Sequence, residues 1–79
     1  MKCNVLYFAQ FQQARGVDQE TVSTSALTPK ELLAELTKRH QLPDRISALR
    51  VSVNHELTNW NHQLQDDDSV AFLPPFAGG

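Results

Sequence analysis

An apolar run close to the N-terminus predicts a strand with two apolar faces. Residues 3–9 are rich in apolar and aromatic types, and from Val5 onward the apolar positions are continuous instead of alternating. This pattern is typical of a central strand that a helix covers on one side, while the other side is either buried as well or offered to a partner. The polar segment that follows, residues 10–16, contains Phe11. We interpret it as a short helical turn that ends at Gly16.

The clearest local signal in the chain is the start of a helix at residue 28. Residues 28–31 (Thr-Pro-Lys-Glu) form a capping box, with a hydroxyl at the N-cap, proline at the first helical position and glutamate at the third. Positive charge gathers at residues 38–40, where it suits the carbonyl end of a helix, and Pro43 prevents continuation. Between these ends an apolar stripe recurs at helical spacing and predicts the face that covers a sheet. Its residues are Leu32, Leu33 and Leu36.

Four shorter segments predict the remaining strands. Residues 49–53 alternate strictly, as in a strand half buried against the helix, whereas Val22 is the one strong apolar residue of its segment, as at a sheet edge. Asn54–His55 predicts a tight turn, and the three aspartates at 66–68 predict a solvated turn. Pro74–Pro75 ends the last strand, because neither ring nitrogen can donate a hydrogen bond. The four segments are residues 19–24, 49–53, 56–58 and 69–73.

The order of these elements predicts an α+β fold of the β-grasp type. Strand, strand, helix, strand, short strand and strand make a mixed sheet with one main helix packed across it. The first and last strands are then neighbours, and their parallel pairing requires the helix-bearing crossover that the sequence contains. A chain of 79 residues has room for one such domain. We assign residues 1–73 to it and residues 74–79 to an extended C-terminal tail.

Charge and cysteine content exclude several classes of function. The formal net charge is -2 and the basic residues are scattered, so no basic stripe is available to neutralise a phosphate backbone, and nucleic acid is not an expected partner. Cys3 is the single cysteine, which cannot form an internal disulfide and suits a buried strand position. No targeting segment precedes the first strand and no apolar run approaches the length of a membrane span. We therefore expect a cytoplasmic location and no membrane contact.

The polar residues do not form the pattern of an enzyme active site or a metal centre. The histidines lack the spacing of metal ligands on one helix face, and a single cysteine excludes the usual zinc clusters. The aspartates at 66–68 cannot all point at one ion, and they lack the spacing of a calcium loop. We expect no metal and no cofactor bound by the chain itself. The three histidines are His40, His55 and His62.

The C-terminal residues carry the one pattern with a clear chemical use. Gly78 and Gly79 lack a Cβ atom, so the last backbone atoms can enter a channel too narrow for any other residue. Phe76 can act as an apolar anchor, and Pro74–Pro75 stiffens the start of the tail so that the glycines project. A tail of this kind fits the active site of another protein. The full tail consists of Pro74, Pro75, Phe76, Ala77, Gly78 and Gly79.

The chain resembles the small, sulfur-carrying subunits of molybdopterin synthase, a ubiquitin-like family. Residues 5–10 (Val-Leu-Tyr-Phe-Ala-Gln) are similar to the family's first strand, and residues 70–79 (Val-Ala-Phe-Leu-Pro-Pro-Phe-Ala-Gly-Gly) are similar to its ending. The resemblance covers almost the whole length. Two turns depart from it, since Asn54–His55 stands where the family often has Asn-Gly, and residues 66–69 stand where it has an Asp-Gly-Asp-Glu-like turn. His and Asp adopt a positive φ less readily than glycine, so turn geometry is where a difference is expected.

The resemblance implies sulfur transfer through the C-terminal carboxylate. An adenylating and sulfurating enzyme would use ATP to convert the Gly79 carboxylate into an acyl-adenylate, and sulfur would then displace AMP to leave a thiocarboxylate. In the family the tail enters the large subunit of the synthase, here expected in a heterotetramer, where the sulfur is delivered to a pterin precursor of the molybdenum cofactor. The chain would react as a cosubstrate without catalysing alone. The motif match places Phe8, Leu57 and Leu73 against the large subunit, although all three also suit a plain core.

Two other functions remain open at this point. A sibling carrier that serves thiamine biosynthesis or protein modification would share both the fold and the chemistry. Such thiamine carriers tend to be shorter, to lack the segment at residues 10–16, and to vary where this chain has Pro74–Pro75. A β-grasp interaction module would instead bind a partner through its sheet and never activate its terminus.

Overall fold

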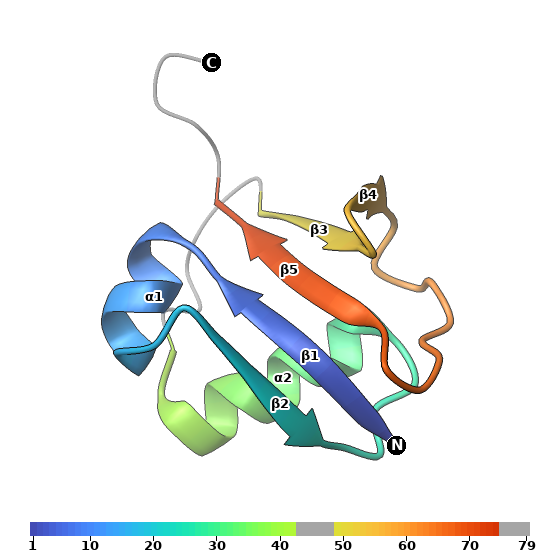
Figure 1. Cartoon of the computed structure of the whole chain (residues 1–79), viewed down its shortest axis with the longest axis horizontal. Coiled ribbons are helices and arrows are strands. Elements are labelled where there is room, and N and C mark those ends of the chain that lie inside the picture. Colours follow the sequence, from blue (N-terminus) through green and yellow to red (C-terminus); the bar gives the residue numbers. More distant parts are fainter. Residues whose placement is uncertain (43–48, 75–79) are drawn as a thin grey trace.

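The computed structural model describes residues 1–42 and 49–74, and within them a sheet with two helices (Figure 1). One helix of 12 residues lies across the sheet and a second one of 7 residues lies at its end, which agrees with one main helix and a short helical turn. Pro43 and the tail from Pro75 onward lie outside the described residues. The elements in chain order are β1 (Lys2–Tyr7), α1 (Ala9–Arg15), β2 (Gln19–Ser23), α2 (Pro29–His40), β3 (Arg50–Val53), β4 (Glu56–Thr58) and β5 (Ser69–Leu73).

The five strands form one mixed sheet in the order β2-β1-β5-β3-β4. Strands β1 and β5 run parallel, with Val5 opposite Val70 and Tyr7 opposite Phe72, whereas the other three pairings are antiparallel. The predicted pairing of the first and last strands is therefore confirmed. Figure 1 shows β5 in the middle of the sheet and α2 behind it. β5 is hydrogen-bonded on both sides, as β1 and β3 also are, and it lies at the centre of the sheet.

Strand β1 is shorter than the apolar run predicted. The run suggested a strand over residues 3–9, but the extended backbone ends at Phe8, and Ala9 takes a φ of 50° as α1 begins. A positive φ breaks the pleat of a strand, so the last residue of the predicted segment belongs to the helix. Helix α1 then ends at Gly16, whose φ of 76° makes it the predicted left-handed cap.

Helix α2 starts where the capping box predicts. The Thr28 hydroxyl accepts a hydrogen bond from the Glu31 amide at 3.2 Å, and Pro29 occupies the first turn. The Glu31 carboxylate accepts from the amide of Leu27 at 2.8 Å, which is one residue earlier than a capping box requires. At the other end Gln41 adopts a left-handed φ of 54°, so the helix stops before Pro43 is reached.

The core lies between α2 and the face of the sheet that α2 covers. Phe72 is fully buried, with the Phe11 ring centroid at 6.3 Å and the Trp60 ring stacked on it at 6.0 Å. Two of the three leucines of the predicted helix stripe are fully buried, while Leu33 lies at the margin of the core. The other fully buried apolar side chains include Cys3, Val5, Tyr7, Leu32, Leu36, Val51 and Val70.

The two predicted turns both use positive φ angles. Asn54 and His55 have φ angles of 53° and 73°, and Asp67 has a φ of 70°. The expectation of a solvated turn is wrong for Asp68, which is only 8% exposed. Its carboxylate accepts hydrogen bonds from the side-chain amide of Asn54 at 2.9 Å and from the Gln65 backbone amide at 2.8 Å. These bonds compensate for the loss of water around a buried carboxylate.

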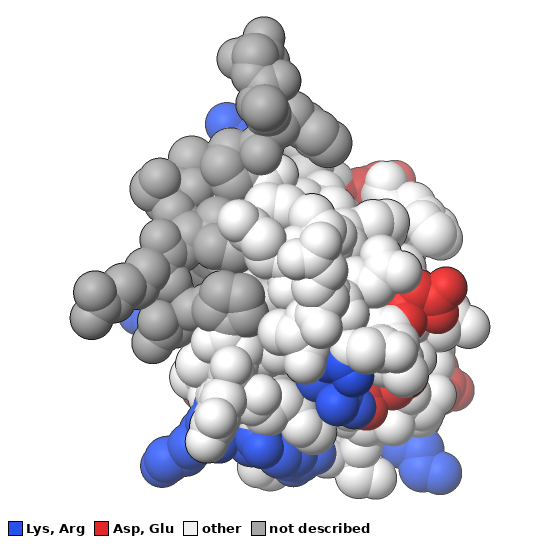
Figure 2. Space-filling model, turned by 90° about the vertical axis from the view of Figure 1, so that its left-hand side faces the viewer, with Lys and Arg blue, Asp and Glu red and all other residues white. Residues whose placement is uncertain are grey.

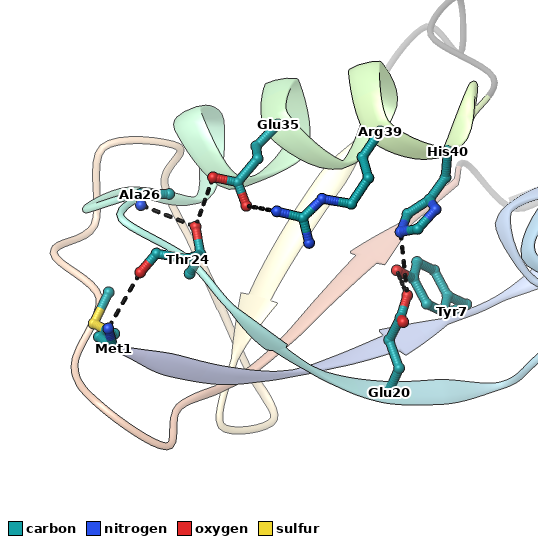
Figure 3. A network of polar contacts seen from close by, with 8 residues as sticks. All are labelled: Met1, Tyr7, Glu20, Thr24, Ala26, Glu35, Arg39 and His40. Atoms are coloured by element: carbon teal, nitrogen blue, oxygen red, sulfur yellow. Dashed lines mark hydrogen bonds and ion pairs between the residues drawn. The ribbon is translucent and has the colours of Figure 1, made fainter.

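A polar network joins the C-terminal ends of β1 and α2 (Figure 3). The Glu20 carboxylate accepts hydrogen bonds from the Tyr7 hydroxyl at 2.5 Å and from Arg15 at 2.9 and 3.0 Å, and His40 lies 3.9 Å away. The bonds from Arg15 hold the pKa of Glu20 below its ordinary value of 4.5. Burial and the bond to Glu20 raise the pKa of Tyr7. Glu20 is therefore a carboxylate that stabilises the fold in its charged form.

Replacing His55 with glycine should stabilise the protein. The left-handed backbone at residue 55 is strained for histidine and unstrained for glycine, so His55→Gly should raise the free energy of unfolding by about 1 kcal/mol. Gly16→Ala is the matched reverse change, because an added Cβ there meets nothing within 4 Å and only the φ of 76° opposes it. It should lower stability by a similar amount. Urea denaturation measures both, and a His55→Gly protein no more stable than the parent would contradict the assigned turn.

Acid should weaken the contribution of Glu20. Since its pKa is depressed in the folded state, its stabilisation is fully present above pH 4.5 and is lost as pH falls through the lower folded-state pKa. Glu20→Gln should be less stable than the parent at neutral pH, and the difference should shrink below pH 4.5. Chemical denaturation over a pH series measures this difference. If the difference in stability between Glu20→Gln and the parent stayed constant below pH 4.5, the charged carboxylate would not be what Arg15 and Tyr7 bind.

Candidate functional site

The start of the C-terminal tail is set by the end of β5. Leu73 is the last residue of the strand and pairs with Arg50 of β3. Pro74 follows it outside the strand and is half-buried. Figure 1 shows that β5 ends at the same edge of the sheet as β1, close to where α1 begins. The predicted tail residues Pro75, Phe76, Ala77, Gly78 and Gly79 lie outside the described residues.

The predicted partner residues lie on the face of the sheet that α2 leaves open. One row of paired residues crosses four strands. Leu57 of β4 pairs with Ser52 of β3, and Ala71 of β5 pairs with both Ser52 and Leu6 of β1. Side chains of paired residues point to the same side of a sheet, and this side is opposite to the buried Val5 and its neighbours. Phe8 follows Leu6 by two residues in extended backbone, and Leu73 follows Ala71 by two in β5. All three predicted residues therefore share this face.

Exposure separates these residues from the core. Phe8 is 45% exposed and Leu57 is 62% exposed, so the alternative that they are plain core residues is wrong for both. Leu73 is partly buried beside them. We refer to Leu6, Phe8, Leu57 and Leu73 as the open apolar face; Ala71 lies between them but is only 4% exposed. An exposed apolar face of this kind is typical of a surface that a partner covers.

Sequence reasoning missed Leu6, Ala71 and Arg50, which lie on the same face as the three predicted residues. Strand parity carried the missing signal for Leu6, because positions 3, 5 and 7 all belong to the buried side. Arg50 places a positive charge opposite Leu73, at the point where the tail begins. This charge is suitably placed to attract an acidic group of a partner next to the tail.

The three histidines lie apart from one another in the described structure. His40 lies near Glu20, His62 contacts the Thr58 hydroxyl at 3.3 Å, and His55 is exposed in its turn. Within residues 1–42 and 49–74, no three His, Cys, Asp or Glu side chains are arranged to hold a metal ion. In the same part of the chain, neither helix has the length and apolar character needed to cross a bilayer.

Comparison of the sequence with known proteins assigns the chain to a family. The model of the ThiS family matches residues 5–79, which is all of the chain except its first four residues. The chain belongs to the ThiS family. Two curated relatives named molybdopterin synthase sulfur carrier subunit support a full-length relation. The Escherichia coli protein is 36% identical over 78 residues, covering 95% of this chain and 96% of the relative, and the human protein is 34% identical over 80 residues, covering 95% and 91%.

Solved structures confirm the predicted β-grasp fold. SAMP1 from Haloferax volcanii superposes with a TM-score of 0.82 over 100% of both chains at 21% identity, which is a likeness of fold. A protein–protein complex of subunits 1 and 2 of molybdopterin-converting factor from Helicobacter pylori contains a chain that matches with a TM-score of 0.69 at 28% identity, again over 100% of both chains. The resemblance that the sequence suggested is therefore confirmed for the fold and the family.

Truncating Phe8 should leave the domain stable. Phe8→Ala removes a side chain that is 45% exposed, so the free energy of unfolding should fall by less than about 1 kcal/mol. Phe11→Ala is the matched control, since it removes the same atoms from a fully buried position and should cost about 3–5 kcal/mol. Urea denaturation compares the two. Equal losses would place Phe8 in the core and remove it from the partner surface.

Proposed function

We propose that this chain is the sulfur carrier subunit of a molybdopterin synthase, and that the Gly79 carboxylate carries the sulfur. The main support is the near full-length relation to carriers of that name, with 95% of this chain and 96% of the Escherichia coli protein aligned at 36% identity. The Gly-Gly ending lies inside the part of the chain that the family model matches. The open apolar face gives the domain a surface for a partner, next to the start of the tail.

The proposed chemistry begins with activation of the terminal carboxylate. A carboxylate is a poor electrophile because its charge is delocalised, so an adenylating enzyme joins it to AMP from ATP and releases pyrophosphate. Sulfur at the oxidation level of sulfide, supplied by a donor, then displaces AMP and leaves a thiocarboxylate on Gly79. The anionic sulfur is a better nucleophile than the oxygen it replaces. It attacks a carbon of the pterin precursor while a C–O bond at that carbon breaks, and the released oxygen takes up a proton. Water cleaves the resulting thioester, which leaves the sulfur on the pterin and returns the Gly79 carboxylate.

The proposed partner of the open apolar face is the large subunit of the synthase. The Helicobacter pylori structure is a complex of two subunits, and its matching chain has the fold of this one. The large subunit supplies the acids, bases and pterin pocket that this chain lacks, and two carriers with two large subunits form a heterotetramer. We place the reaction in the cytoplasm, with ATP bound by the adenylating enzyme and no cofactor held by the chain itself.

The other functions have less support. The curated relatives bear the name of the molybdopterin carrier, which favours it over thiamine biosynthesis. The archaeal neighbour SAMP1 is only 21% identical, so its likeness concerns the fold and does not favour protein modification. An interaction module that never activates its terminus gives no reason for a tail of two prolines, an aromatic residue and two glycines after a central strand.

Deleting Gly79 tests the proposal. The shortened chain should fold normally and should bind the large subunit nearly as well as the parent, because the open apolar face is unchanged. It should not support any formation of molybdopterin from the precursor in a reconstituted reaction with the adenylating enzyme, ATP and a sulfur donor. Full activity of the shortened chain would contradict the proposal.

Phe8→Ala is the complementary variant. It keeps Gly79, so it should still be adenylated and sulfurated, but it should bind the large subunit at least about tenfold more weakly, a loss of about 1.4 kcal/mol. Isothermal titration calorimetry measures the affinity. Unchanged affinity would show that the partner uses another surface.

A further inference from the structure

A groove runs along α2 at the margin of the core, where Leu33 and Trp60 are only partly buried. It has a volume of about 1040 Å³ and lies between the helix and the turn that follows β4. Its floor is apolar, formed by Leu33 and Ala34 of the helix and by Trp60. The backbone amide of Lys30 donates to the Trp60 carbonyl at 3.2 Å, which holds the turn against the start of the helix. The groove is therefore a fixed feature of the packed domain.

Positive charge stands at both ends of this floor. Lys30 and Lys38 line the groove and are both exposed, and in the described part of the chain no carboxylate lies within ion-pair distance of either. Glu35 also lines the groove, but its carboxylate accepts hydrogen bonds from Thr24 at 3.0 Å and from Arg39 at 3.3 Å (Figure 3). The charges left to attract a ligand are thus the two ammonium groups.

The last turn of α2 carries Lys38, Arg39 and His40, of which Arg39 is paired with Glu35 and His40 lies 3.9 Å from Glu20. Figure 2 shows Lys and Arg side chains along the lower edge of the side where α2 ends. This local charge contrasts with the net charge of -2 of the whole chain. A negatively charged partner would therefore be drawn to this side of the molecule and not to the molecule as a whole.

We propose that this groove is a second docking surface, which binds an acidic and apolar helical segment of a partner protein. Lys30 and Lys38 are eight residues apart, which is about 12 Å along a helix axis. Two carboxylates spaced by two helical turns reach both ammonium groups, and apolar side chains between them cover Leu33, Ala34 and Trp60. The groove lies beside α2, whereas Phe8 lies on the face of the sheet that α2 leaves open; Trp60 stands between the two surfaces, because it also lines a smaller pocket with Arg50 and Leu57. The proposal is independent of the function of the tail.

Trp60 gives a direct report on occupancy, because it is the only tryptophan of the chain. The probe is a helical peptide with two leucines on one face and two glutamates two turns apart. It should change Trp60 fluorescence and shift the amide resonances of Leu33, Ala34 and Trp60 in the full chain. The same peptide with lysines in place of the glutamates, and one with serines in place of the leucines, should each bind at least tenfold more weakly. Shifts confined to the open apolar face, or equal binding of all three peptides, would overturn the proposal.

Charge reversal separates the groove from general electrostatics. The double variant Lys30→Glu with Lys38→Glu should lose the acidic peptide and should prefer the basic one. The single variant Lys38→Glu should weaken binding of the acidic peptide, whereas Lys2→Glu changes the net charge equally but lies in β1, so it should keep the preference of the parent. If the Lys38→Glu and Lys2→Glu variants lose the acidic peptide to the same extent, the groove is not the site.

Two further measurements distinguish a small anion and a second copy of the chain from the proposed occupant. A small dicarboxylate that competes with the peptide at equal concentration would assign the site to a small anion and overturn the proposal. Sedimentation of the parent chain that shows dimers, abolished by the Lys30→Glu and Lys38→Glu changes, would assign the groove to a second copy and would also overturn it. We expect the parent chain to sediment as a monomer and the dicarboxylate to leave peptide binding unchanged.

Discussion

The position of β5 between β1 and β3 is the constraint on which the account depends. The strand is hydrogen-bonded on both sides, and its Phe72 is fully buried between Phe11 and Trp60. Truncating a side chain packed in this way costs several kcal/mol, so the end of β5 is fixed relative to the rest of the domain. Pro74 follows two residues later. Pro74, the last described residue, therefore has a defined place at the end of a central strand.

The small size of the domain accounts for its unequal faces. One helix covers one side of the sheet, and within residues 1–42 and 49–74 no second layer covers the other side. Phe8, at the end of the neighbouring β1, and Leu57, in β4 two strands from β5, therefore stay exposed. Under the proposed function, the large subunit would bind at this open face. The proposed second docking surface is the groove beside α2.

The elements that depend on local residue patterns were predictable from the sequence. The start of α2 follows from residues 28–31, and the alternation around Val51 predicted β3. The burial of Asp68 was not predictable, because its partner Asn54 comes from a distant turn and only the fold brings the two together. The groove beside Trp60 depends in the same way on the approach of a turn to a helix. Of the candidate site, Phe8 and Leu57 were correctly placed at the surface, whereas the role of Gly79 stays a prediction.

Intact-mass spectrometry of the full chain after incubation with an adenylating enzyme, ATP and a sulfur source tests the central claim most directly. The account predicts the mass change of one oxygen replaced by sulfur, located by fragmentation to the C-terminal peptide. Cys3 is fully buried and should be unmodified. An unchanged mass, or the gain of a whole sulfur atom at Cys3, would contradict the claim that the terminal carboxylate carries the sulfur.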